Sequence, residues 1–135
     1  MKSQVLGAET ICEVLKESQR GELVFPEVVG RMLEAGVESY FVDVARAEDV
    51  VYLRDGSTLT TKVDLALDPV TENYSETELV SAIRGAQKDE IRYPEFMRRA
   101  CAAGVVAYWA FLTGRKVIYF GRKGELHVEH FPGAK

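Results

Sequence analysis

Two stretches of the chain carry apolar residues at the three- and four-residue spacing of an amphipathic helix. The first contains Ile11, Val14 and Leu15, and the second contains Leu79 and Ile83. Each stretch begins with the spacing of a capping box, in which a hydroxyl and a later carboxylate satisfy unpaired backbone N–H groups. The two expected capping boxes are Thr10 with Glu13 and Ser75 with Glu78.

A shorter helix is predicted after each of these, entered through Phe25-Pro26-Glu27 and through Tyr93-Pro94-Glu95. Proline suits the first helical turn because its missing N–H would be unpaired there anyway. Gly36 and Gly104 are expected to end these helices in the left-handed conformation. After each glycine the hydrophobic period falls to two, which predicts strands. The predicted strands cover residues 39–44, 50–53, 59–67, 105–112, 116–120 and 125–131.

The elements come in the same order twice because the sequence repeats at a distance of 68 positions. Residues 18–27 read SQRGELVFPE and residues 86–95 read AQKDEIRYPE. The same offset places Ala35-Gly36-Val37 against Ala103-Gly104-Val105. Two copies in register indicate two similar folding units.

We therefore expect an α+β fold built by internal duplication of a helix–helix–three-strand antiparallel unit. The repeats lie at about residues 11–67 and 79–131, and residues 68–74 link them. Helices are expected on one face of the sheet, with a pseudo-twofold axis between the copies. A chain of 135 residues is too short for two stable domains of ordinary size, so residues 1–135 should form one domain.

Composition narrows the functional classes. The chain is 47% hydrophobic and 28% charged, which is typical of a folded protein, and its net charge is −4. Lys and Arg do not cluster on a predicted face, so nucleic acid is not an expected partner. No run approaches the roughly 20 apolar residues that cross a bilayer, and the start lacks an apolar signal segment. We expect a cytoplasmic protein without a membrane anchor or cofactor.

The first strands of the two copies differ from each other most on their outward faces. In the second copy that face carries Ala107, Trp109 and Phe111, where the first copy has Ser39, Phe41 and Asp43. A strand that is apolar on both sides needs cover on both sides. The cover can come from a neighbouring element of the chain, a second subunit or an apolar ligand. Trp109 and Phe111 are the residues expected to make such an interaction.

Polar residues kept by both copies suggest a second candidate site. Glu27 with Arg31, and Glu95 with Arg99, have the spacing of a helical ion pair with a purely structural role. The alternative is that these pairs converge near the axis and form one polar pocket. Four further residues would then line that pocket: Gln19, Gln87, Tyr40 and Tyr108.

The end of the chain carries a third candidate. Alternation places Glu125, His127 and Glu129 on one face of the last predicted strand, while His130 points the other way. Imidazole and carboxylate groups at this spacing can bind a divalent metal or act in acid–base chemistry. The alternative is that this strand face is exposed to solvent and has no catalytic or metal-binding role. Cys12 and Cys101 lie in predicted helices among apolar residues and are interpreted as buried free thiols.

The doubled FPE/YPE-to-AGV-to-Tyr pattern, the Val117–Gly121 strand and the ending Val128-Glu129-His130-Phe131-Pro132 together resemble the YbcV-like family. These are small bacterial and prophage proteins, often labelled phage envelope protein. The resemblance runs from about Ile11 to Pro132. It implies a compact α+β fold and a bacterial or prophage origin, and it implies no reaction, cofactor or catalytic residue.

Two functional hypotheses follow from the residues. The first is a non-enzymatic module that binds another protein chain, its own copy included, through Trp109 and Phe111 beside Ala107. The second is a metal-dependent enzyme or small-ligand-binding protein that uses His127, Glu129 and Glu125. An apolar small-molecule pocket between helices and sheet is a third possibility. No Gly-rich phosphate loop or nucleophile motif supports an enzyme directly.

Overall fold

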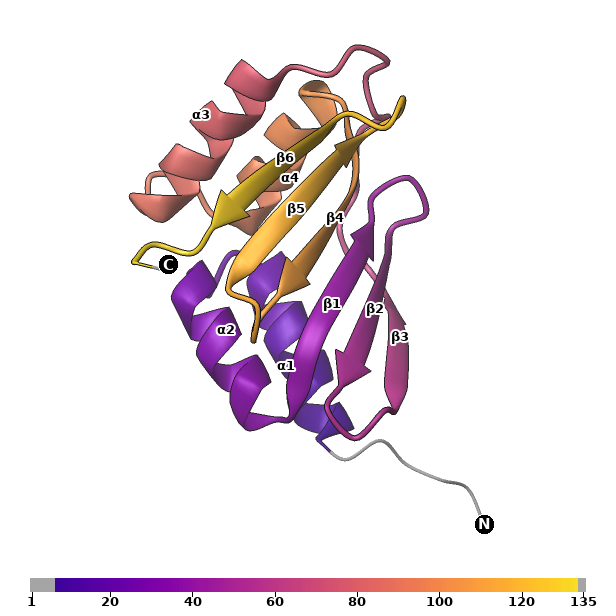
Figure 1. Ribbon diagram of the computed structural model, residues 1–135, viewed down its shortest axis with the longest axis vertical. Helices are drawn as coiled ribbons and strands as arrows, with labels where there is room; N and C mark the ends of the chain where they lie inside the picture. Colours follow the sequence, from indigo (N-terminus) through magenta and orange to yellow (C-terminus); the bar gives the residue numbers. More distant parts are fainter. Residues whose placement is uncertain (1–6, 134–135) are drawn as a thin grey trace.

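The computed structural model describes residues 7–133, which form four helices and one six-stranded antiparallel sheet (Figure 1). The helices are α1 (Ala8–Gln19), α2 (Phe25–Glu34), α3 (Glu76–Gln87) and α4 (Tyr93–Ala102). The strands are β1 (Val37–Asp43), β2 (Glu48–Leu53), β3 (Thr58–Lys62), β4 (Val105–Phe111), β5 (Lys116–Gly121) and β6 (Leu126–His130). The predicted α+β fold is confirmed at this level.

The sheet has the order β3-β2-β1-β4-β5-β6, so the first strand of each half meets its counterpart at the centre. Tyr40 pairs with Ala110 and Val42 with Tyr108 across this junction. All four helices lie behind the sheet in Figure 1, and no described element covers its front. The two halves therefore contribute to one sheet with a helical face and an open face.

The core lies between the helices and the sheet. Fully buried side chains come from every helix, for example Ile11, Met32, Leu79 and Met97. They pack against alternate residues of the central strands, such as Val42. Burial of each such side chain contributes about 1.5–3 kcal/mol. Because both halves supply residues to one cluster, neither half has an interior of its own.

The third strand is shorter than predicted. Alternation suggests a strand over residues 59–67, but β3 ends at Lys62, and Val63 N donates to Ala47 O at 2.7 Å. Leu65 and Leu67 remain partly buried against the core. Their alternation reflects a connecting segment that packs its apolar side chains while its backbone has left the sheet.

The two capping predictions have different outcomes. Ser75 is the N-cap of α3, and its Oγ accepts a hydrogen bond from Glu78 N at 3.2 Å. The predicted cap at Thr10 is wrong, because α1 begins at Ala8 after Gly7 and Thr10 lies inside the helix. Gly7 has φ +80°, so the left-handed backbone starts this helix without a side-chain cap.

Gly104 follows α4 in the left-handed conformation, with φ +84°, as predicted. A Cβ atom at this position would lie 2.6 Å from Asn73 O. The glycine therefore serves both the turn into β4 and the close passage of the segment that joins the halves.

Candidate functional site

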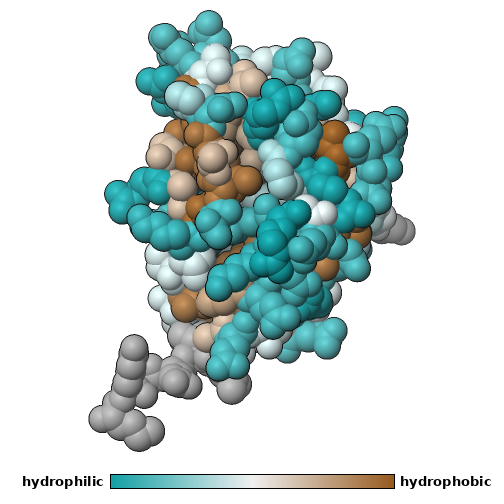
Figure 2. All heavy atoms as spheres, turned by 180° about the vertical axis from the view of Figure 1, so that it is seen from behind, coloured by the Kyte–Doolittle hydropathy of each residue, from teal (hydrophilic) through white to brown (hydrophobic). Residues whose placement is uncertain are grey.

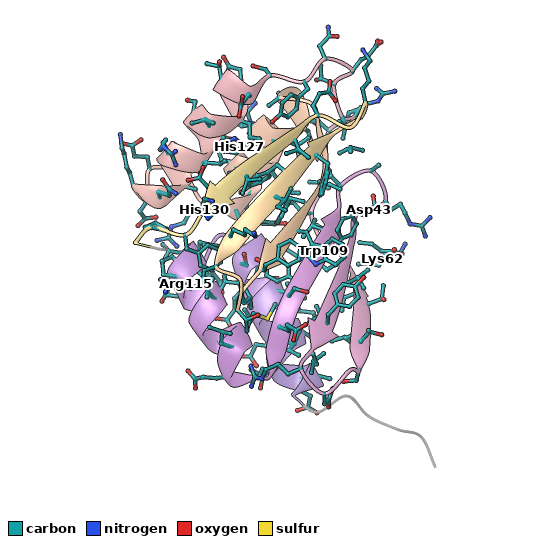
Figure 3. The ribbon with its side chains drawn as sticks, viewed as in Figure 1. Asp43, Lys62, Trp109, Arg115, His127 and His130 are labelled. Carbon is teal, nitrogen blue, oxygen red and sulfur yellow. The ribbon has the colours of Figure 1, made fainter. Side chains whose placement is uncertain are left out.

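The open face of the sheet carries an aromatic cluster centred on Trp109. The ring of Trp109 stacks on Phe111 at 5.2 Å and on Tyr52 at 5.5 Å, and it meets the edge of Phe41 at 5.3 Å. Its indole Nε1 donates a hydrogen bond to Ser39 Oγ at 3.2 Å. Figure 3 shows Trp109 on the front of the sheet, near the junction of the halves. The indole orientation is therefore fixed without any partner.

Strand register extends this cluster into an apolar row across the sheet. Phe41 pairs with Trp109, and Trp109 pairs with Ile118. Beyond these, Val50 lies on the β2 side and Val128 on the β6 side. Side chains along the row are partly exposed, and Val128 at the edge is 38% exposed.

The two halves of the open face differ in polarity. On the β6 side, Leu126 is 57% exposed beside Phe120. The opposite side carries Asp43 and Glu48, which pair across β1 and β2, and Glu48 also pairs with Lys62. Figure 3 shows Asp43 and Lys62 on the β1–β3 side of Trp109. The apolar half thus includes the predicted interaction residues Ala107, Trp109 and Phe111, of which Ala107 is buried by its neighbours.

A buried carboxylate lies on the helical face of the sheet. Asp49 on β2 is 1% exposed, and its Oδ2 accepts a hydrogen bond from Gln19 Nε2 at 3.2 Å. Gln19 Oε1 accepts from Asp64 N at 2.8 Å, so the amide also holds the segment after β3. Burial raises the pKa of Asp49 to about 7, because the ionised form loses its hydration there.

Tyrosines surround this carboxylate. Tyr93 and Tyr108 share a hydrogen bond of 2.9 Å between their hydroxyl groups, and Tyr40 lies beside them. Burial raises the pKa of all three phenols. A cavity of about 10 Å³ lies among these side chains, which is room for about one water molecule. Thr61 Oγ1, opposite Asp49 in the register, is buried without a hydrogen-bond partner among the described residues.

The structure brings together only part of the predicted polar pocket. Gln19, Tyr40 and Tyr108 line the cavity, whereas the two helical Glu–Arg pairs lie elsewhere. Arg31 binds Glu17 at 3.0 Å in place of Glu27.

Glu27 accepts from Val24 N at 2.9 Å at the start of α2. Glu95 binds Arg99 at 2.9 Å, as the helical spacing predicts. Hydrogen bonds from two arginines lower the pKa of Glu95 to about 2, and Arg98 contributes more than Arg99. These pairs stabilise helices, and their side chains form no common pocket.

The predicted His127 site lies under helix α3, so its strand face is not solvated. His127 Nδ1 lies 2.7 Å from Glu76 Oε2, and Nε2 lies 3.0 Å from Glu129 Oε1. Arg84 Nη1 donates to Glu129 Oε2 at 2.6 Å. Burial alone would raise the pKa of Glu129, but the hydrogen bonds from Arg84 and His127 leave it lowered. Gln87 belongs to this network, with Nε2 3.3 Å from the same Glu129 oxygen.

The third proposed metal ligand, Glu125, is not part of that network. Its Oε1 accepts from Lys123 N at 2.9 Å in the turn before β6. Both ring nitrogens of His127 already face carboxylates on opposite sides, and only the doubly protonated ring can donate to both. Within residues 7–133, no three His, Cys, Asp or Glu side chains are grouped to hold a metal ion.

Sequence reasoning missed Asp49 and the hydrogen bond of Tyr93. Asp49 lies two and four residues before Val51 and Leu53 on β2, so the three side chains share the buried face of the strand. This alternation is the signal that the Asp49 carboxyl faces the core. The aromatic residue before each proline is expected to point toward the core, and Tyr93 does pack there, but the sequence gives no sign of its hydrogen bond to Tyr108. The counterpart of Tyr93, Phe25, lies at the surface, 37% exposed against Phe131, so the paired positions have different surroundings.

Both cysteines are free, with Cys101 buried and Cys12 half-buried. Burial raises the pKa of the Cys101 thiol, which makes it a poorer nucleophile. No helix within residues 7–133 is long and apolar enough to cross a bilayer.

Comparison with known proteins places this arrangement in a family. The family model described as "Protein of unknown function (DUF1398)" matches residues 8–130. The chain belongs to this family. Relatives of this DUF1398 chain include the uncharacterized proteins Rv2012 and MT2067 of Mycobacterium tuberculosis and Mb2035 of Mycobacterium bovis. Each is 29% identical over 109 residues, which cover 79% of the chain and 66% of the relative. The chain thus spans slightly less than two thirds of the length of each of those proteins, and their names state no activity.

Proposed function

We propose that this chain works by binding a protein surface, in the first place a second copy of itself, through the apolar half of its open sheet face. The observation that carries the proposal is the position of Trp109. It lies at the centre of a face that no described element covers, and aromatic partners hold its ring in place. A large aromatic side chain fixed before binding loses little entropy on association and contributes strongly to interface energy.

The comparison of positions 68 residues apart supports a binding role for the second half. On the open face, polar residues of β1 and β3 correspond to apolar residues of β4 and β6. Surface strands without a partner gain nothing from exposed leucine and phenylalanine, which instead favour association. The replaced pairs are Ser39 and Ala107, Asp43 and Phe111, Thr58 and Leu126, and Thr60 and Val128.

A second copy fits this surface because of how charge is distributed around it. The apolar half is bordered by Lys116 and His130 on one side and by Asp43 with Glu48 beyond β4. A twofold contact between apolar halves would leave these charges at a solvated rim, which is the usual arrangement of a stable interface.

Sedimentation of matched variants tests the proposal. Val128 and Thr60 occupy equivalent edge positions of the same row, so Val128→Lys and Thr60→Lys place one charge at either end. Val128→Lys should raise the dimer dissociation constant at least about tenfold, because the ammonium would be buried without a partner. Trp109→Ala should weaken the dimer about thirtyfold. Thr60→Lys should sediment like the wild-type protein.

A wild-type protein that stays monomeric at every concentration would refute self-association. Equal effects of Val128→Lys and Thr60→Lys would refute the assignment of the surface. Circular dichroism of each variant separates loss of association from loss of fold.

The alternative of a metal-dependent enzyme has less support. Its three residues do not converge, and the nitrogens that would bind a metal face carboxylates already. Titration with zinc, followed by the His127 ring resonances, tests it directly. A stoichiometric shift of those resonances would restore the alternative.

We also infer that the two halves arose by internal duplication and are related by a pseudo-twofold axis between β1 and β4. The shared element order and the mirrored strand order support this inference. Membership in the YbcV-like group, a prophage origin and a cytoplasmic location stay predictions from the sequence.

A further inference from the structure

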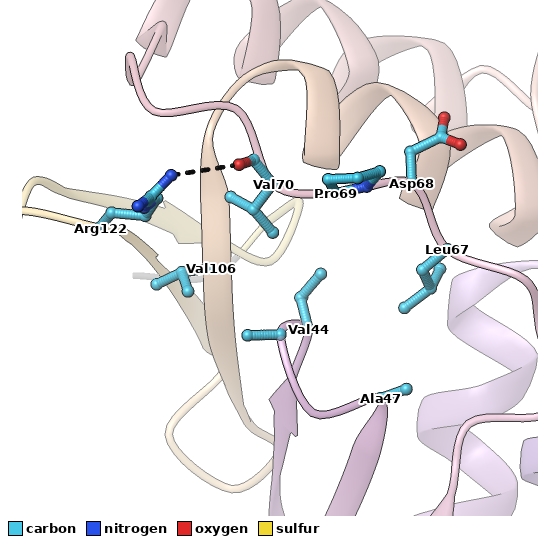
Figure 4. Close-up of a pocket in the computed structure, with 9 residues that line it drawn as sticks. Val44, Ala47, Leu67, Asp68, Pro69, Val70, Val106 and Arg122 are labelled. Atoms are coloured by element: carbon cyan, nitrogen blue, oxygen red, sulfur yellow. Dashed lines mark hydrogen bonds between the residues drawn. The ribbon is translucent and has the colours of Figure 1, made fainter.

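A hollow of about 520 Å³ opens on the helical side of the molecule. It lies between the β1–β2 turn, the start of β4 and the segment that joins the halves (Figure 4). Seen from behind, hydrophobic side chains gather at the upper left of the molecule in Figure 2. Its volume lies in the range of about 300–1,000 Å³ that small-molecule sites occupy.

Apolar side chains form the walls of the hollow. Figure 4 shows Val44, Val70 and Leu67 directed toward the space between them, with Val106 at its left edge. Ala45, Ala47 and Pro69 complete the apolar lining. An occupant of this space would therefore contact apolar atoms over somewhat more than half of the exposed wall.

The rim carries one cation. Arg122 follows β5 and is exposed, and its Nη1 makes only a long contact of 3.5 Å with Val70 O. Among the described residues it forms no ion pair. Asp68 also lines the hollow, but its carboxylate points away from the space in Figure 4.

The position of Arg122 has a physical reason. The corresponding residue of the first half, Arg54, lies 3.4 Å from Leu33 O near the end of α2. In the second half the equivalent carbonyl is Cys101 O, which already accepts from Thr71 N at 3.0 Å. The joining segment thus occupies the carbonyl, and the Arg122 guanidinium is left at the edge of the hollow.

We propose that this hollow binds an unbranched aliphatic carboxylate, with the hydrocarbon chain among the valines and the carboxylate on Arg122. The occupant is argued from charge and polarity together. An apolar wall takes up the hydrocarbon chain, and a guanidinium at the mouth pairs with a carboxylate by charge-assisted hydrogen bonds. This site is separate from the open sheet face and does not depend on the proposed self-association.

Calorimetric titration with sodium decanoate tests the proposal, with decyltrimethylammonium as a probe of the same chain and opposite charge. Decanoate should bind the wild-type protein at one site per chain and more tightly than the cation. Arg122→Gln should weaken decanoate binding about tenfold. Arg54→Gln removes the matching arginine of the other half and should leave the affinity unchanged.

Val70→Phe places a ring in the hollow and should abolish binding, with the melting temperature as a control for folding. In NMR spectra, decanoate should shift the amide resonances only of residues around Val44, Val70 and Val106. Shifts centred on Trp109, equal binding of both probes, or an Arg122→Gln variant with wild-type affinity would each overturn the proposal. Absence of any decanoate binding would overturn it as well, whatever the oligomeric state.

Discussion

At the scale of single residues, the least expected feature is the buried carboxyl of Asp49. A carboxylate removed from water is costly unless charges or several hydrogen bonds compensate. Here Gln19 supplies one hydrogen bond, and no cation faces the group among the described residues. The folded protein therefore holds the Asp49 proton more tightly than the unfolded chain does.

This proton makes stability depend on pH in a defined direction. The pKa of Asp49 rises from 3.8 to about 7 on folding, so the unfolded state releases its proton first as pH increases. The free energy of unfolding should fall between pH 4 and pH 7, by about 4 kcal/mol at most, and level off above.

Asp49→Asn should remove this part of the pH dependence, because the amide keeps the hydrogen-bond acceptor and cannot ionise. Urea unfolding at pH 5 and pH 8 measures the effect. The variant should gain stability over the wild-type protein at pH 8 and much less at pH 5. Asp64→Asn removes an exposed charge nearby and is the matched control. A gain for Asp49→Asn that is the same at both pH values would contradict the buried, protonated carboxyl.

Individual candidate residues were only partly predictable. Trp109 and Phe111 stood out because a strand with two apolar faces is visible in the sequence itself. Asp49 did not, because one acidic residue among Val50 and Val51 is compatible with either face until the register is known. The hollow beside Arg122 was invisible as well, since it depends on which carbonyl the joining segment occupies.

At the scale of elements, the starts of α1 and α3 show that the same local sequence signal has different outcomes in different surroundings. Thr10 and Ser75 carry the same capping spacing, yet only Ser75 caps a helix. Gly7 precedes α1 and adopts φ +80°, and the helix starts at Ala8, two positions before Thr10. A hydroxyl followed by a glutamate is thus insufficient when a nearby glycine offers another way to begin.

Alanine substitution distinguishes the two hydroxyls. Ser75→Ala should lower the free energy of unfolding by about 1 kcal/mol, because Glu78 N loses its acceptor. Thr10→Ala should change it little or raise it by a few tenths of a kcal/mol, because alanine is the better helix former. Thermal unfolding of both variants gives the comparison. Similar losses for the two would mean that Thr10 caps α1 in solution.

Elements of the second half were predicted better than those of the first half. The strands β4, β5 and β6 lie within about one residue of their predicted bounds, whereas β3 ends five residues early at Lys62. The residues after β3 keep a period of two while they pack on the core as a connecting segment. Hydrophobic periodicity reports burial, and burial alone does not distinguish a strand from an extended connection.

At the scale of the whole molecule, the β1–β4 ladder joins the two halves and their side chains share one core. We therefore predict one cooperative unfolding transition. Denaturation followed by far-ultraviolet circular dichroism and by Trp109 fluorescence should give coincident midpoints. Trp109 lies at the junction, so separate unfolding of the halves would displace one curve from the other.

The sequence repeat predicted the succession of elements, but it left open whether the halves form one sheet or two. That outcome depends on contacts between residues far apart in sequence, such as Tyr40 with Ala110, which no local pattern encodes. The repeat likewise does not predict which face of the sheet stays open.

The two outer strands of the sheet have unlike borders, and this limits how the protein can assemble. One border presents threonines and Lys62, and the other presents Leu126 and Val128. Lysine and short polar side chains discourage further strands from adding, whereas exposed aliphatic ones invite them. Growth into a filament needs a receptive border at both ends of each subunit. If copies of the chain were to add along this border, a receptive border at one end only would close the assembly at a pair.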